Sequence, residues 1–161
     1  MEKKTKDKID KRLEVLPKHH IDSCIFLESH DKEETRQCIR YLNKVGYNYR
    51  GVVPFPVLSE MFFIALHLDN YDKRIKFIDL FKDTLEAQRI EISRPMQFEK
   101  TSLEIKKLDS FLEHDITDRH VLASAIEDKA YILVTTDKKL IKNSVLEKRF
   151  NINIRHPKDL L

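Results

Sequence analysis

Four acidic residues stand out in the sequence because of the apolar segments beside them: Asp22, Glu60, Asp118 and Asp137. Asp22 ends a predicted strand over 18–22, and Asp137 comes shortly after another over 131–134. In an open parallel sheet, ligands bind beyond the carboxyl ends of the strands. Asp22 and Asp137 are therefore expected at the same edge of a sheet, where their carboxylates could act together.

Glu60 is the only charged residue between Val52 and Leu66. Pro56 is expected to open a helix there, and that helix has little polar surface. Glu60 is therefore expected to be mostly buried, where an ionised carboxylate is costly unless it is paired or bound to a metal ion. The alternative is a glutamate that emerges at the open end of the helix.

Asp118 lies near the start of a predicted helix over 117–129. Its face of that helix is otherwise apolar, with Val121, Leu122 and Ala125, so Asp118 is expected to point along the core side. The alternative is a helix-start acid favoured by the dipole, with Thr117 as N-cap. Asp137 could likewise only cap the helix that follows it.

Together the four acids are harder to explain as caps. If they converge, their mutual repulsion is severe without a cation, and hard oxygen ligands select Mg²⁺ or Mn²⁺. No Cys/His pattern indicates zinc. His19 and His20 are adjacent, so they point to opposite faces of a strand and are expected to be structural or surface residues.

The elements that must position these acids alternate between strands and helices. This alternation predicts an α/β domain with a short parallel sheet covered by helices on both faces. The expected strands are 18–22, 52–53, 90–92, 131–134 and 152–155. The expected helices are 31–45, 56–68, 71–87 (with Ile75, Ile78 and Leu85 turned inward), 97–112, 117–129 and 138–146.

Length and composition fit one domain. The chain has 161 residues. A charged extension is expected over 1–15, followed by a single domain over 16–161. Its two cysteines are expected to be reduced in a cytoplasmic protein, and no segment has the length and apolarity to enter a membrane. Two glycines cannot build a glycine-rich phosphate loop.

The end of the chain is basic. Residues 138–161 hold seven Lys/Arg (138, 139, 142, 148, 149, 155 and 158) against two acids (147 and 159), or about +5, although the whole chain carries only +3. Such a surface attracts phosphates. The alternative is an ordinary solvated face on a lysine-rich protein.

The order of these features resembles the PIN-domain nucleases. The resemblance is carried by "HIDSCIF" (Asp22 and Ser23), "PFPVLSEMFF" (Glu60), "DRHVLASA" (Asp118) and "ILVTTDKKL" (Asp137), with "INIRHPKDLL" as the last strand and tail. It covers about residues 18–161. The chain departs from the family at Cys24, where Asn or Ser is common, and this departure predicts the loss of a polar contact.

The resemblance implies a three-layer PIN-like fold and a metal-dependent endoribonuclease. Asp22, Glu60, Asp118 and Asp137 would hold one or two Mg²⁺ or Mn²⁺ ions, and cleavage would leave 5′-phosphate and 3′-OH ends. Around them, Ser23 and Thr135 would orient a carboxylate, and Asp115 could share or replace the role of Asp118. Lys138, Lys139 and Arg119 would contact the RNA backbone.

The resemblance also implies partners. Many small members of the family are VapC-type toxins that pair with an antitoxin protein and form homodimers. The alternatives are a nuclease of RNA processing without a toxin role, and a non-catalytic RNA-binding or scaffold PIN module. A phosphatase-like metal hydrolase would need a phospho-acceptor motif after the first strand, and the sequence has none there.

Overall fold

The computed structural model describes residues 14–27, 31–86, 90–93 and 98–161. The predicted extension over 1–15 therefore lies almost wholly outside the described residues. Among the described helices, none combines the length and apolarity needed to cross a membrane.

The centre of the fold is a five-stranded sheet in the order β3-β2-β1-β4-β5, with every pair parallel. The strands are β1 (Lys18–Ile21), β2 (Arg50–Pro54), β3 (Ile90–Ser93), β4 (Ile132–Val134) and β5 (Asn153–Arg155). Parallel strands need crossover connections, and helices between them supply these. The predicted fold class is confirmed.

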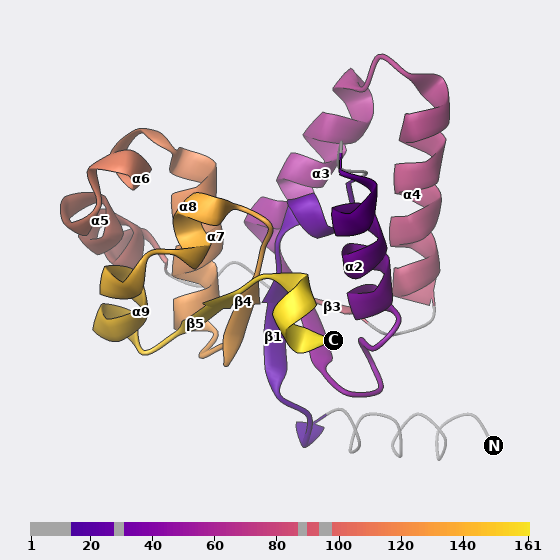
Figure 1. Ribbon diagram of the computed structural model, residues 1–161. Helices are drawn as coiled ribbons and strands as arrows, with labels where there is room; N and C mark the ends of the chain where they lie inside the picture. The colour runs from indigo at the N-terminus through magenta and orange to yellow at the C-terminus, as the bar shows by residue number, and fades with distance from the viewer. Residues whose placement is uncertain (1–13, 28–30, 87–89, 94–97) are drawn as a thin grey trace.

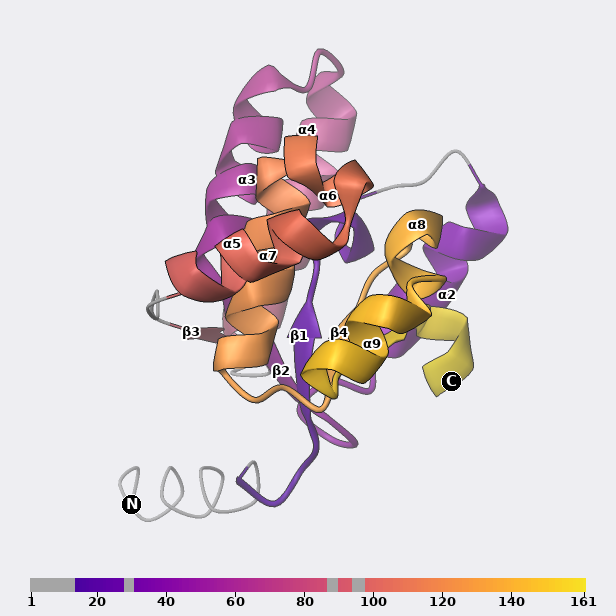
Figure 2. The ribbon, with the colours of Figure 1, turned by 90° about the vertical axis from the view of Figure 1, so that its left-hand side faces the viewer.

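Helices cover both faces of the sheet and also rise above one edge (Figures 1 and 2). On one side lie α5 (Glu99–Leu108), α6 (Ser110–His114), α7 (Ile116–Glu127) and α9 (Ser144–Phe150), and on the other α2 (Lys32–Leu42) and α4 (Tyr71–Glu86). The helix α3 (Phe55–His67) follows β2 directly and extends with α4 beyond the carboxyl ends of the strands. The short elements are η1 (Ser23–Ile25), α8 (Lys138–Ile141) and η2 (Pro157–Leu160).

The helix α7 packs directly on one face of the sheet, and its sequence explains why. Val121, Leu122, Ala123 and Ala125 are buried in the core. The two alanines allow the helix axis to approach the sheet closely, and α7 contacts both β2 and β4. The predicted inward face of this helix is therefore confirmed.

The adjacent histidines of β1 are buried on opposite sides, as their spacing predicts. The His19 ring stacks on Tyr49 with the centroids 4.2 Å apart, and its Nδ1 lies 3.1 Å from the Tyr41 hydroxyl. Burial lowers the pKa of His19 to about 4, so the ring is neutral. His20 Nε2 lies 2.9 Å from Asp128 Oδ2, at the end of α7.

Several predicted elements need correction. The helix expected over 97–112 is broken at Asp109, whose Oδ1 accepts the Leu112 backbone N–H and starts α6. The helix expected over 138–146 is likewise two helices, because Asn143 caps α9. Hydrophobic spacing alone continues across both breaks.

The helix pair α3–α4 differs most from expectation. Within α3 only Val57 and Met61 are buried, although the sequence of this helix has little polar surface. On α4, Ile75 and Ile78 are exposed rather than turned inward, although Leu85 is partly buried against the core. The upper part of the pair projects past the carboxyl ends of the strands (Figure 1), while α4 packs on the core through Phe77, with Leu80 and Phe81 partly buried beside it.

Candidate metal centre

The register of β1 and β4 places Asp22 beside Thr135. Ile21 pairs with Val134, so the residues that follow them, Asp22 and Thr135, are neighbours at the carboxyl edge of the sheet. The Asp22 backbone N–H donates to Val134 O at 3.0 Å, and the Thr135 hydroxyl donates to Asp22 Oδ2 at 2.7 Å. The side chain of Asp22 is buried and held from both strands.

Two further donors hold the Asp22 carboxylate from η1. The Ser23 backbone N–H donates to Oδ1 at 2.7 Å, and the Cys24 thiol donates to Oδ2 at 3.2 Å. Cys24 Sγ also accepts the Thr136 backbone N–H at 3.2 Å. The polar contact expected to be lost at Cys24 is therefore present, made by a thiol, and sequence reasoning missed it.

Glu60 reaches the same edge from α3. Its Oε2 accepts the Ser23 hydroxyl at 2.6 Å, and the hydroxyl also lies 3.4 Å from Asp22 Oδ1. Ser23 thus links two of the predicted ligands. Glu60 is half-buried, between the two positions that the sequence left open.

Asp118 is half-buried at the start of α7 and does not cap the helix. The N-cap is Asp115, whose Oδ1 accepts the Asp118 backbone N–H at 3.1 Å, and not Thr117 as the sequence suggested. Because Asp115 supplies the cap, the carboxylate of Asp118 is left for another role.

Asp137 does cap a helix, as the alternative reading held. Its Oδ1 accepts the Lys139 backbone N–H at 2.7 Å, and its own N–H donates to Thr135 Oγ1 at 3.0 Å. Thr135 therefore joins Asp22 to the loop that carries Asp137. Capping uses one carboxylate oxygen and leaves the second.

Five acids lie close enough to affect one another's charge, and we refer to them as the acid cluster: Asp22, Glu60, Asp115, Asp118 and Asp137. Burial first, and then the charges of the other four carboxylates, raise the pKa of Asp118 to about 8. Burial likewise raises the pKa of Asp22, against its hydrogen bonds from Thr135, Cys24 and Ser23. Burial and the charges of Asp22 and Asp115 also raise the pKa of Glu60.

The donor set fits a hydrated divalent ion rather than a closed cage. Across the described part of the chain, no three Asp, Glu, His or Cys side chains come close enough to enclose an ion. Mg²⁺ does not need such a cage, since it keeps several waters and is usually bound by one or two carboxylates and substrate phosphates. A cation beside the cluster would offset the repulsion that raises the pKa of Asp118.

The residues predicted to contact RNA divide into two groups. Lys138 and Lys139 are exposed on α8, next to Asp137. Arg119 is buried, and it donates to Ser102 Oγ, Leu112 O and Glu113 O at 2.9–3.1 Å. These bonds tie α7 to α5 and α6, so Arg119 is a structural residue and the expectation that it contacts RNA is not supported.

A comparison with protein families decides the identity of the fold. The model for the PIN domain matches residues 20–146. The chain belongs to the PIN domain family. Proteins of this family are generally nucleases that use divalent metal ions. No curated relative matches the sequence of this PIN domain.

Solved structures with this PIN fold differ widely from the chain in sequence. VapBC2 from Rickettsia felis, bound to a DNA fragment from its promoter, is 16% identical with a TM-score of 0.55, and the match covers 86% of this chain and 98% of that one. FitAcB from Neisseria gonorrhoeae is 13% identical with a TM-score of 0.55, covering 86% and 97%. VapBC-1 from nontypeable Haemophilus influenzae is 16% identical with a TM-score of 0.53, covering 87% and 98%.

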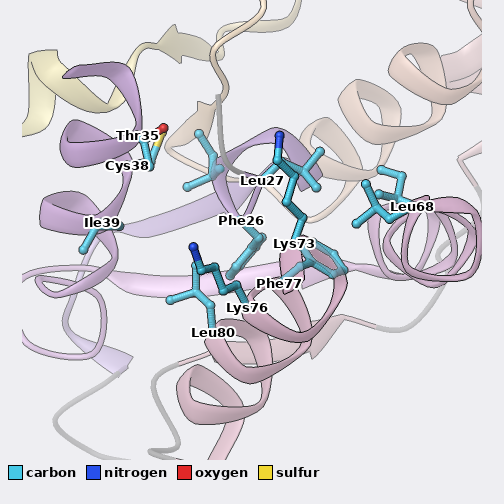
Figure 3. Close-up of a pocket in the computed structure, with 12 residues that line it drawn as sticks. Phe26, Leu27, Thr35, Cys38, Ile39, Leu68, Lys73, Lys76, Phe77 and Leu80 are labelled. Atoms are coloured by element: carbon cyan, nitrogen blue, oxygen red, sulfur yellow. The ribbon is translucent and has the colours of Figure 1, made fainter. Parts of the chain in front are cut away.

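The PIN domain has a second surface feature, an apolar groove of about 580 Å³ between η1, α2, α3 and α4 (Figure 3). Its walls include Phe26, Cys38, Ile39, Leu68, Phe77 and Leu80. Lys73 and Lys76 of α4 reach along it, so a basic margin borders an apolar floor. Sequence periodicity gave no sign of this groove.

The raised pKa of Asp118 predicts how the stability of the metal-free protein changes with pH. The folded protein holds this proton more tightly than the unfolded chain, whose aspartates titrate near 3.8. Stability should therefore fall as pH rises from about 4 to 8. Asp118→Asn removes the charge, so urea unfolding in chelator should show a gain in stability over wild type at pH 8 that vanishes near pH 4.

The matched control is Asp72→Asn, since Asp72 is also a first-turn acid but is exposed on α4. It should lower stability by about 0.3–1 kcal/mol through the helix dipole. If Asp118→Asn behaves like this control at pH 8, Asp118 is an ordinary helix-start acid.

Proposed function

We propose that this PIN domain is a metal-dependent endoribonuclease that hydrolyses RNA phosphodiester bonds in the cytoplasm, as the toxin of a toxin–antitoxin pair. The acid cluster carries the proposal. Acids from β1, α3, α7 and the β4–α8 connection are electrostatically coupled at one edge of the sheet, and the pKa of Asp118 rises to about 8. Strongly perturbed carboxylates at the carboxyl end of a parallel sheet are typical of a functional site.

In this proposal Asp22, Glu60, Asp118 and Asp137 hold Mg²⁺ or Mn²⁺, and Asp115 shares the role of Asp118. The ion supplies a Lewis acid that activates water and stabilises charge on the phosphate. Thr135 and Ser23 hold the carboxylates of Asp22 and Glu60 in one orientation through hydrogen bonds of 2.7 and 2.6 Å. A bound cation would favour the ionised form of Asp118, because it would replace the proton as the neutralising charge.

The basic end of the chain supports RNA as the substrate. Lys138 and Lys139 follow Asp137 directly, so a phosphate bound by them lies next to the acid cluster. Lysine contacts with phosphates supply affinity independent of sequence. These two lysines also reduce the repulsion between RNA and the acid cluster, and a bound cation would reduce it further.

The apolar groove supports an antitoxin partner. Two of the similar structures are VapBC complexes, so the fold is compatible with a partner chain. An amphipathic segment would place its apolar side chains between α2 and α4, and its acids against Lys73 and Lys76. Outside the groove, exposed apolar side chains support a homodimer: Phe62, Leu66, Tyr71 and Ile75.

The nuclease proposal predicts cleavage of RNA that depends on Asp22. Mixed cellular RNA incubated with the protein and Mg²⁺ or Mn²⁺ should yield fragments with 5′-phosphate ends. Asp22→Asn should cut on the order of 100-fold more slowly, because a ligand is lost from the metal centre. Mn²⁺ should also raise the melting temperature of wild type, since it binds the folded state alone.

Asp72→Asn is the control for this assay and should cut like wild type. Equal cleavage by wild type and Asp22→Asn would assign the activity to another site or a contaminant. An unchanged melting temperature at millimolar Mn²⁺ would count against the metal centre.

The RNA path predicts the salt dependence of binding. Changing Lys138 and Lys139 together to Gln should weaken RNA binding and flatten the slope of log affinity against log salt by about 1 for each lost phosphate contact. The control pair is Lys106 and Lys107, also adjacent and exposed, in the last turn of α5. Equal slopes for both double variants would move the RNA path away from α8.

The partner proposal predicts that antitoxin binding depends on Ile39 and not on Ile78. Ile39 is 43% exposed and lines the groove, whereas Ile78 is 41% exposed and does not line it. With the protein encoded by the neighbouring reading frame as the antitoxin, Ile39→Glu should abolish co-purification and Ile78→Glu should leave it. Both substitutions are at exposed positions, so unfolding measured by circular dichroism should change little. Retained binding by Ile39→Glu would exclude the groove.

A further inference from the structure

A second cavity, the α3–α7 cavity, adjoins the acid cluster. It has a volume of about 660 Å³ and lies between the start of α3, Phe98 and the start of α7. Glu60 lines it and also accepts the hydrogen bond from Ser23 in the cluster. Whatever occupies the cavity therefore lies against the proposed reaction centre.

Aromatic rings form much of the cavity wall. Phe55 and Phe63 of α3 are half or more exposed, although rings of this size are normally buried. The Phe63 ring stacks on His67 with the centroids 4.1 Å apart, and Phe98 packs on His120 at 5.0 Å. These contacts fix two of the rings in place while leaving surface for a flat ligand.

The polar groups of the cavity are neutral apart from Glu60. Ser59 and Thr117 bring hydroxyls, and His120 brings an imidazole whose pKa is lowered by burial and by Arg119. Among the described residues that line the cavity, none is Lys or Arg. A phosphate has no cationic partner there, whereas a flat ring with hydrogen-bonding edges has both stacking surfaces and polar contacts.

We propose that the α3–α7 cavity binds an unstacked base of the RNA, beside the phosphodiester bond that lies at the acid cluster. This inference rests on the proposed ribonuclease function and adds the way in which the RNA is held. Bases stack on aromatic side chains only when they are free of a duplex, so the cavity selects single-stranded RNA. Base contacts here complement the phosphate contacts of Lys138 and Lys139, which carry no sequence information.

Two adjacent phenylalanines provide a matched test. Phe62 and Phe63 are 62% and 63% exposed on the same helix, but only Phe63 lines the cavity. Each would be changed to Leu in the Asp118→Asn background, so that the RNA stays intact during a binding measurement with Mg²⁺. Phe63→Leu should weaken the binding of a short single-stranded RNA about tenfold, since one stacked base is lost, and Phe62→Leu should not.

Photo-crosslinking locates the base without any need for cleavage. Single-stranded RNAs with 5-iodouridine at successive positions would be irradiated on the same protein. Crosslinks should map to Phe55, Phe63 or Phe98, with one RNA position dominant. Crosslinks elsewhere, together with equal binding by Phe62→Leu and Phe63→Leu, would overturn the proposal.

Cleavage measured in parallel separates this proposal from the nuclease proposal. RNA cutting by wild type with crosslinks outside the cavity would overturn the base site alone. Crosslinks in the cavity without cutting by wild type would support the base site and overturn the catalytic proposal. If Phe63→Leu loosens the antitoxin but leaves RNA binding unchanged, the cavity holds a protein segment and the base site is overturned.

Discussion

Carboxylates that gather at one end of the sheet repel one another, and strand pairing and helix packing hold them there against that repulsion. Asp22 is fixed by its place at the end of the central strand, and the parallel register brings the end of β4 beside it. The α7 helix then brings Asp118 to the same edge by packing its alanine face against the sheet. None of these acids can move away without disrupting strand pairing or helix packing. The repulsion is therefore a built-in property of the fold.

Nearby hydrogen-bond donors stabilise the carboxylates of Asp22 and Glu60. Ser23, Cys24 and Thr135 donate to Asp22, and Ser23 donates to Glu60. Asp115 and Asp137 each use a carboxylate oxygen to cap a helix, where a negative charge is favourable. Asp118 accepts none of the hydrogen bonds described above, and burial and its neighbours' charges raise its pKa to about 8. The fold thus neutralises the cluster only in part, and the raised pKa of Asp118 reflects the burial and repulsion that remain.

Much of the site follows from the sequence, for definable reasons. A strand that ends at an acid predicts the sheet edge, so the nearness of Asp22 and the loop of Asp137 could be inferred from topology alone. The face of Asp118 followed from helical spacing. By contrast, the Cys24 contacts depend on the backbone of η1 and on the loop after β4, which no spacing rule describes.

The wrong predictions concern burial in α4 and at Arg119, and the points at which two predicted helices break. Apolar character in α3 and α4 predicted contact with the core, but periodicity does not say whether an apolar face meets the core, a partner or a ligand. Arg119 was expected to contact RNA because it follows Asp118 directly, yet it is buried, where three hydrogen-bond acceptors from α5 and α6 stabilise it. The breaks at Asp109 and Asn143 depend on single capping bonds.

The projecting helix pair has a consequence for how the protein exists in solution. Phe62, Leu66, Tyr71 and Ile75 face outward on α3 and α4. Clustered apolar side chains of this kind promote aggregation whenever nothing covers them. A protein that covered them would raise the yield of soluble chain as well as controlling its chemistry. The dose of active protein would then depend on how much companion is made alongside it.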